Sequence, residues 1–110
     1  MLNFTHIKGD TFEEVPFQIN YNDVALSLTG ATIKMQLRKE CGGKIYLSLT
    51  SDGNAGLTIT NASQGRFKIN NQIINIDSGV YLYDIEITFS NGEVKTWISG
   101  EFNVKCDITR

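Results

Sequence analysis

The fold is decided by an alternation of apolar and polar residues, which is most regular in the stretch Tyr81-Leu82-Tyr83-Asp84-Ile85-Glu86-Ile87-Thr88-Phe89-Ser90-Asn91-Gly92. Successive side chains of a strand point to opposite faces of a sheet, so this pattern predicts a strand with one buried face. Asn91 and Gly92 end the stretch, and both residue types tolerate the positive φ that a two-residue type I′ turn requires. We therefore predict a β-hairpin that turns at Asn91-Gly92.

A two-residue turn fixes which residues of the two strands face each other. Phe89 would pair with Val94, and the buried face of the second strand would consist of Val94, Thr96 and Ile98. Trp97 would then point into solvent. A one-residue bulge would instead return Trp97 to the core, and the sequence leaves both orientations open.

Alternation with a period of two also runs through most of the remaining chain. It predicts further strands at 15–21, 31–37, 45–49, 57–59, 67–69 and 102–108. Tyr46 alternates out of phase with its apolar neighbours and is expected to point outward, whereas Tyr21 is expected on the buried face of its strand. Pro16 indicates an edge position, and Gly100 indicates a bend or bulge that could let the last strand cross between sheets.

Turn-forming sequences such as Asn22-Asp23 and Cys41-Gly42-Gly43 separate these strands, and no segment has the periodicity of a helix. About eight strands without a covering helix predict an all-β fold, an immunoglobulin-like antiparallel β-sandwich. A length of 110 residues with 41% apolar residues fits one domain, spanning residues 1–110.

The sequence Asp77-Ser78-Gly79-Val80-Tyr81 before the most regular strand has the form of a tyrosine corner. In that motif a tyrosine hydroxyl donates a hydrogen bond to the backbone a few residues upstream and holds the connection between strands. An ordinary turn followed by a core tyrosine is the alternative, and both fit a sandwich. Asp77, Gly79 and Tyr81, with Asn91 and Gly92, are therefore the residues expected to define the fold.

Charge and composition exclude several classes of partner. The net charge is -2 and no run of Lys or Arg is present, which argues against binding to a nucleic-acid backbone. No apolar run is long enough to cross a bilayer, and no leader pattern is present, so we expect synthesis in the cytoplasm and no membrane contact. Cys41 and Cys106 lie far apart in the sequence and suit neither a metal pair nor a disulfide-rich scaffold.

Catalysis requires a positioned set of reactive side chains, and the sequence offers few. His6 is the only histidine and is expected to be an exposed strand residue. Asp84 and Glu86 alternate onto one face and could form an acid and base pair, but a solvated sheet face explains them better. Asp52-Gly53-Asn54 lacks the further ligands of a calcium loop. We expect no enzymatic activity, no metal and no cofactor.

Exposed aromatic residues and the last strand are the candidate contact surfaces. Trp and Tyr are enriched at binding hot spots. The segment 102–110 is expected to be an edge strand whose unpaired backbone groups could pair with a neighbouring molecule. The candidate contact residues are Trp97, Tyr46, Lys105, Ile108 and Arg110.

Four segments carry a resemblance to a known family: Lys8-Gly9-Asp10-Thr11-Phe12, Leu28-Thr29-Gly30-Ala31-Thr32-Ile33-Lys34-Met35-Gln36-Leu37-Arg38, Gly79-Val80-Tyr81-Leu82-Tyr83-Asp84-Ile85 and Gly100-Glu101-Phe102-Asn103-Val104-Lys105-Cys106-Asp107-Ile108-Thr109-Arg110. Together they resemble small bacteriophage virion proteins similar to the amino-terminal domain of baseplate upper proteins. The resemblance spans nearly the whole chain.

The resemblance implies a non-enzymatic β-sandwich adaptor that docks to other virion proteins in a tail, baseplate, neck or head-fibre assembly. It also implies location in the virion and a homo-oligomer or a place in a symmetric assembly. The long carboxy-terminal extension of the baseplate proteins does not follow Arg110, which favours a free-standing connector or decoration protein. A carbohydrate-binding or adhesion module, with Trp97 and Tyr46 as stacking platforms, is the alternative.

Overall fold

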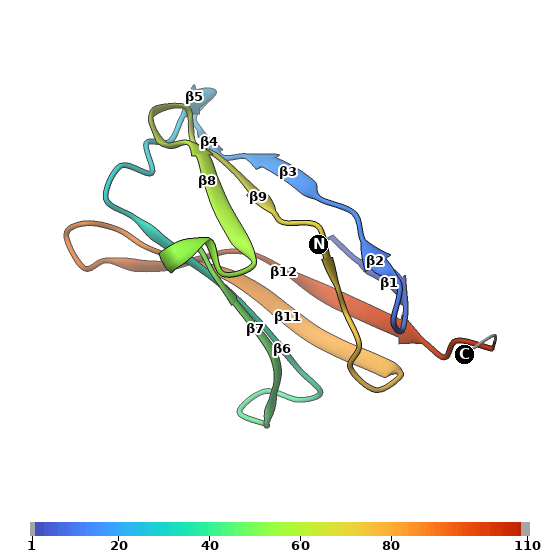
Figure 1. Cartoon of the computed structure of the whole chain (residues 1–110). Coiled ribbons are helices and arrows are strands. Elements are labelled where there is room, and N and C mark those ends of the chain that lie inside the picture. The colour runs from blue at the N-terminus through green and yellow to red at the C-terminus, as the bar shows by residue number, and fades with distance from the viewer. Residues whose placement is uncertain (1, 109–110) are drawn as a thin grey trace.

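The computed structural model describes residues 2–108, and strands packed as two layers make up most of them (Figure 1). One layer is a five-stranded sheet. In spatial order its strands are β1 (Phe4–Ile7), β12 (Val94–Lys105), β11 (Gly79–Thr88), β6 (Thr32–Arg38) and β7 (Ile45–Thr50). The predicted strands at 31–37, 45–49 and 81–89 are confirmed as β6, β7 and β11.

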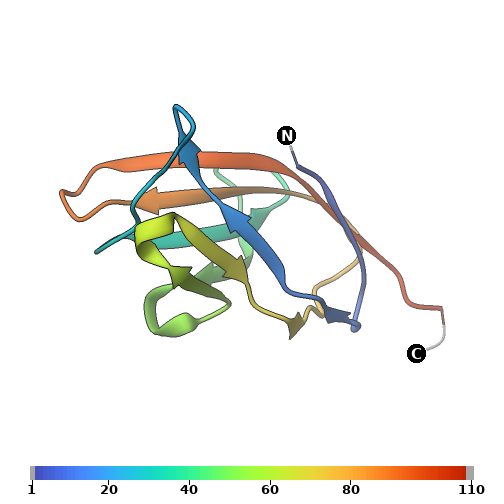
Figure 2. The ribbon, with the colours of Figure 1, turned by 90° about the horizontal axis from the view of Figure 1, so that it is seen from above.

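The second layer is built around a three-stranded sheet. Its strands in order are β3 (Val15–Gln18), β9 (Arg66–Ile69) and β8 (Leu57–Asn61). Two short pairs continue it along the chain, namely β2 (Thr11–Phe12) with β10 (Gln72–Ile73), and β4 (Asn20–Tyr21) with β5 (Val24–Ala25). Figure 2 shows β3 crossing obliquely over the strands of the five-stranded sheet. Pro16 lies in β3, which is an edge strand as predicted.

The core lies between the two layers. It consists of the inward residues of each strand, and its largest fully buried side chains are Tyr81, Phe67, Phe102, Leu28, Ile33, Met35, Leu37, Leu57, Ile69, Ile85, Ile87 and Val104. These are mostly the apolar positions of the period-two pattern, so burial follows the alternation of the sequence. The predicted all-β, immunoglobulin-like sandwich is confirmed.

The strand number and the pairing differ from the prediction. Among residues 2–108 there are twelve strands where about eight were predicted, because the expected strand at 15–21 divides at Ile19 and several two-residue pairs form. β1 pairs with β12 in parallel, with Phe4 opposite Phe102 and Ile7 opposite Lys105. The five-stranded sheet is therefore mixed. Gly100 pairs regularly with Tyr83, so the predicted bend or bulge between sheets at Gly100 is wrong.

His6 is buried, with only 8% of its surface exposed, so its predicted exposure is wrong. Alternation within β1 places Phe4 and His6 on the inner face. The His6 ring contacts Phe12 edge-on, and its Nε2 lies 3.0 Å from the carbonyl oxygen of Asp10. His6 therefore helps to fasten β1 to the following turn.

The tyrosine corner is confirmed. The Tyr81 hydroxyl donates a hydrogen bond of 2.5 Å to the carbonyl oxygen of Asp77. Gly79 between them adopts a φ of 153°, which L side chains rarely adopt. Burial raises the pKa of the Tyr81 phenol, and the nearby charge of Asp77 raises it further, so this hydroxyl remains a donor at neutral pH.

The hairpin at Asn91-Gly92 is confirmed, but its two-residue turn is wrong. Thr88 pairs with Val94, so five residues form the loop instead of two. Phe89 donates its N–H to the Glu93 carbonyl at 2.8 Å, and the Asn91 side chain accepts the Glu93 N–H at 2.9 Å. The Asn91 side chain thus forms an Asx turn, and of the two residues predicted to have positive φ only Gly92 does, at 88°.

Candidate functional site

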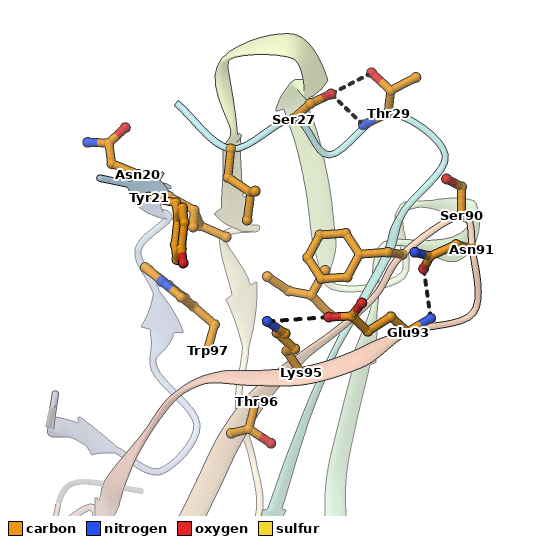
Figure 3. A pocket seen from close by; sticks show the side chains of 14 residues that line it. Asn20, Tyr21, Ser27, Thr29, Ser90, Asn91, Glu93, Lys95, Thr96 and Trp97 are labelled. Atoms are coloured by element: carbon orange, nitrogen blue, oxygen red, sulfur yellow. Dashed lines mark hydrogen bonds and ion pairs between the residues drawn. The ribbon is translucent and has the colours of Figure 1, made fainter. Parts of the chain in front are cut away.

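A cavity of about 660 Å³ opens at the end of the sandwich where the β4–β5 and β11–β12 hairpins meet (Figure 3). This volume lies within the range of small-ligand sites. Its apolar lining consists of Ile19, Tyr21, Leu26, Ile87, Phe89 and Trp97. Polar residues surround it, namely Asn20, Ser27, Thr29, Ser90, Asn91, Glu93, Lys95 and Thr96. An apolar floor with a polar rim is the composition of a recognition site.

Trp97 forms part of the cavity floor because of a β-bulge. Glu86 pairs with Thr96 and Ile85 pairs with Ile98, which leaves Trp97 as the extra residue of β12. The predicted bulge alternative is therefore correct, and the outward orientation of Trp97 is wrong. The same bulge reverses the predicted burial of Val94 and Thr96, which are both exposed.

Trp97 packs between the two layers and also faces the cavity. Its ring meets Phe17 edge-on with ring centroids 5.5 Å apart, and it meets Phe67 in the same way at 5.7 Å. These contacts fix the orientation of the indole. The cavity therefore has a rigid aromatic residue in its floor.

Tyr21 stands at the mouth of the cavity. The alternation of its strand had predicted it on the buried face, and this prediction is wrong. Asn22 and Asp23 both have positive φ, at 52° and 64°, and they form the tight turn between β4 and β5. This turn projects Tyr21 and Val24 outward, and 69% of the Tyr21 surface is exposed. The Asn-Asp pair predicted the turn, but the alternation alone did not show that the strand would leave the core before Tyr21.

An ion pair lies at the rim of the cavity. The Lys95 Nζ is 3.3 Å from a Glu93 carboxylate oxygen, and both side chains are more than half exposed (Figure 3). An exposed pair of this kind contributes little to stability. Its two charges can therefore be redirected to a bound partner at small cost.

The open edge of the five-stranded sheet adjoins this cavity. β1 pairs with β12 only from Phe102 to Lys105. Within residues 2–108, no strand pairs with the outer side of β12 between Val94 and Ser99, which we call the open edge. The predicted edge at 102–110 is wrong because β1 covers its first part, and the unpaired backbone lies earlier in the same strand.

The residues predicted to form the terminal contact strand are dispersed. Lys105 ends β12, is exposed and pairs with Ile7. Cys106 and Ile108 follow the strand and do not enter the core, and Ile108 is 98% exposed. Arg110 lies outside the described residues.

Tyr46 is also the extra residue of a bulge, since Leu37 pairs with Leu47 and Arg38 pairs with Ile45. Its ring packs edge-on against Tyr81 with centroids 5.2 Å apart. The Nζ atoms of two lysines, Lys39 and Lys44, each lie 5.2 Å from the centre of the ring. The predicted outward orientation of Tyr46 is therefore wrong, and cations occupy its surroundings.

The remaining candidates for chemistry lie apart from the cavity. Asp84 and Glu86 share the outer face of the five-stranded sheet, as predicted, beside Arg38 in a depression of about 400 Å³. The residues Asp52-Gly53-Asn54 form a short 3₁₀ turn. Among residues 2–108 no group of three or more His, Cys, Asp or Glu side chains could hold a metal, and no helix is long and apolar enough to cross a membrane.

Comparison with known proteins finds no family for this chain and only distant structural similarity. No protein-family model and no curated protein sequence matches the chain. Among solved structures, CopC from Methylosinus trichosporium OB3b is similar over 94% of this chain and 84% of its own, with 13% identity and a TM-score of 0.48. Murine CRIg is similar over 96% of this chain and 92% of its own, with 13% identity and a TM-score of 0.35. These values carry no argument about function.

Proposed function

We propose that this chain is a non-enzymatic structural protein of a bacteriophage virion, an adaptor or decoration domain that docks to other virion proteins in a tail, baseplate, neck or head fibre. After synthesis in the host cytoplasm it becomes part of the particle. The resemblance of four segments to the amino-terminal domain of baseplate upper proteins motivates the identity of the partners.

The observation that supports a docking role most directly is the open edge of β12 beside the cavity. Unpaired backbone groups in a strand can accept a strand from another molecule. Around this edge, Tyr21, Val24 and Val94 expose large apolar side chains. Apolar side chains that gather beside an open edge are typical of an interaction surface.

The genes that flank the coding sequence supply the test. Each flanking product is co-expressed with this chain, and co-elution is measured by size-exclusion chromatography. We expect co-elution with at least one portal, tail or fibre protein, and weaker co-elution for the variant Tyr21→Ala combined with Val94→Asp. The matched control is Ile73→Asp. Ile73 is 69% exposed, as Tyr21 is, but it lies in a different part of the surface.

A neighbourhood without virion genes, together with absence of the chain from purified particles by mass spectrometry, would contradict the proposal. If Ile73→Asp lost co-elution as strongly as the variant Tyr21→Ala with Val94→Asp, the contact would not lie at the open edge.

A second candidate function is carbohydrate binding, and the cavity is the observation that favours it. Tyr21 and Trp97 supply aromatic surface, and the amides of Asn20 and Asn91 supply donors and acceptors at the rim. Tyr46 no longer supports this function because its ring packs against Tyr81 under two lysines. Binding on a glycan array that Tyr21→Ala abolishes would favour carbohydrate recognition over docking.

A further inference from the structure

Asn91 and Gly92 lie in the exposed loop between β11 and β12, where Asn91 lines the rim of the cavity (Figure 3). A Cβ built on Gly92 would meet no atom within 4 Å, so the backbone nitrogen of Gly92 is unhindered. Asn91 is the only asparagine of the chain that a glycine follows. A backbone nitrogen in this position can attack the side-chain carbon of the preceding asparagine and close a succinimide ring.

The loop holds the Asn91 carboxamide in an orientation that favours this attack. The Glu93 N–H donates a hydrogen bond of 2.9 Å to the Asn91 Oδ1, which Figure 3 shows as a dashed line. The hydrogen-bonded ring that this contact closes contains both reacting atoms, namely the Asn91 Cγ and the Gly92 nitrogen. Restricting two reacting groups to one turn lowers the entropy that the reaction must lose.

The same hydrogen bond stabilises the charge that develops in the reaction. When the Gly92 nitrogen attacks Cγ, negative charge accumulates on the Asn91 Oδ1. A backbone N–H placed about 2.7–3.1 Å from such an oxygen stabilises the transition state, and the Glu93 nitrogen lies within this range. The donor is in place before the reaction starts, so no rearrangement of the loop is needed to provide it.

One contact opposes the reaction. The Gly92 N–H donates a hydrogen bond of 2.9 Å to the Phe89 carbonyl oxygen, and the nitrogen must leave this bond and release its proton in order to attack. In an exposed loop such a bond is exchanged for a bond to water at small cost, and loops open more readily than the core strands. The contact therefore slows the attack without preventing it.

We propose that Asn91 is a site of spontaneous modification, at which the Gly92 nitrogen converts the asparagine into aspartate and isoaspartate. The Gly92 nitrogen forms a bond to the Asn91 Cγ and gives its proton to the solvent. The bond between Cγ and Nδ2 breaks, and Nδ2 takes up a proton and leaves as ammonia. Water then opens the succinimide at one of its two carbonyl carbons, which yields aspartate or isoaspartate.

The conversion changes the rim of the cavity. Each product carries one more carboxylate, so the formal net charge of -2 becomes one unit more negative. The new carboxylate stands at the rim that Glu93 and Lys95 also line, and it competes with Glu93 for the Lys95 ammonium group. In isoaspartate the former Cγ belongs to the backbone, so the Asx turn is lost. This inference goes beyond the docking role, because it makes the charge and shape of the rim depend on the age of the chain.

Peptide mapping of the folded chain tests the proposal. The purified chain is incubated for days in mildly alkaline buffer and digested with trypsin, which releases residues 69–95 as one peptide. Its mass should rise by the difference between an amide and a carboxylic acid, and fragmentation should place the change at Asn91 before any other asparagine of this peptide reacts. A synthetic peptide of residues 88–95 is the reference. If Asn91 of the folded chain were intact after this peptide had converted fully, the proposal would be overturned.

Two variants at position 93 test the contribution of the loop. Glu93→Pro removes the backbone N–H that faces the Asn91 Oδ1 and should slow the conversion about tenfold, which is less than in an enclosed active site because water reaches the oxygen. Glu93→Gln keeps the N–H and should convert at the original rate. Asn91→Ser lacks the carboxamide and should lose the mass change at this position. Equal rates in Glu93→Pro and Glu93→Gln would overturn the role of the Glu93 N–H.

The conversion requires only the chain and water, so its test is independent of the docking role. A chain that converts at Asn91 and co-elutes with no virion protein would contradict docking and leave the modification in place. A chain that co-elutes with a virion protein and keeps Asn91 intact would have the opposite meaning.

Discussion

The backbone carbonyl of Leu2 lies directly against Gly100, so closely that a Cβ at position 100 would overlap the carbonyl oxygen. The hydroxyl of Tyr83 donates a hydrogen bond to the same carbonyl. Tyr83 and Gly100 face each other across β11 and β12. These contacts hold the segment before β1 against the middle of the five-stranded sheet.

Gly100→Ala is therefore expected to displace Leu2 and loosen β1. Overpacking of this kind lowers the free energy of unfolding by about 1–3 kcal/mol. Hydrogen exchange should become faster for the amides of β1 than for those of β6. Tyr83→Phe is the control, since it removes one hydrogen bond without adding volume and should cost only about 1 kcal/mol. Unchanged protection of β1 in Gly100→Ala would show that the Leu2 contact is not restrictive.

The bulge at Trp97 predicts that an aspartate introduced at position 87 and one introduced at position 94 change the free energy of unfolding by different amounts. Ile87→Asp should lower the free energy of unfolding by several kcal/mol, because about 1% of Ile87 is exposed and the charge would be buried without a partner. Val94→Asp should change it by about 0.5 kcal/mol or less, because 53% of Val94 is exposed. Urea denaturation measures both. Losses of equal size would indicate that Val94 is buried, as in the regular register, and would contradict the bulge.

The floor and the mouth of the cavity should respond differently to truncation. Trp97→Ala removes the contacts with Phe17 and Phe67 and should cost about 2–3 kcal/mol, somewhat below the range for fully buried tryptophans. Tyr21→Ala should cost about 0.5 kcal/mol or less because Tyr21 is mostly exposed. Thermal denaturation of both variants checks this difference. A large loss in Tyr21→Ala would make it unsuitable as a binding probe.

The buried tyrosines predict a loss of stability at high pH. Burial raises the pKa of Tyr81, with smaller contributions from Asp77 and Tyr46, and burial raises the pKa of Tyr83 as well. A pKa raised in the folded state stabilises the fold fully below the unfolded value of about 10, and this stabilisation is lost as the pH rises through the folded value. The urea midpoint should therefore fall above about pH 10, and less steeply in Tyr81→Phe. If the urea midpoint of Tyr81→Phe fell as steeply with pH as that of the unsubstituted chain, Tyr81 would not be a source of the pH dependence.

Alternation determined the fold class because it records which side chains face the core. It predicted the buried positions of β6 and β11, and the motif from Asp77 to Tyr81 predicted the tyrosine corner. The alternation could not locate the bulges at Tyr46 and Trp97, because these two extra residues are apolar enough to belong to either face. Their orientation depends on packing against Tyr81 and Phe67, which lie far away in the sequence.

The site was predicted only in part for a related reason. Trp97 was among the predicted contact residues. The contribution of Tyr21 was not predicted, because it depends on where β4 leaves the core. The position of the open edge depends on how much of β12 is covered by β1. A parallel pair between segments near the two ends of the chain leaves no local signal, because no turn connects its strands. The expected edge was therefore placed at 102–110 instead of Val94 to Ser99.

The pairing of β1 with β12 has a consequence during synthesis. Phe4 leaves the ribosome about 100 residues before its partner Phe102, which corresponds to about 5–20 s of translation at about 5–20 residues per second. During this interval the inner residues of β1, including His6, have no sheet to cover them. A nascent chain arrested before residue 102 should therefore expose the aromatic side chains of β1 to chaperones, and release from the arrest should bury them.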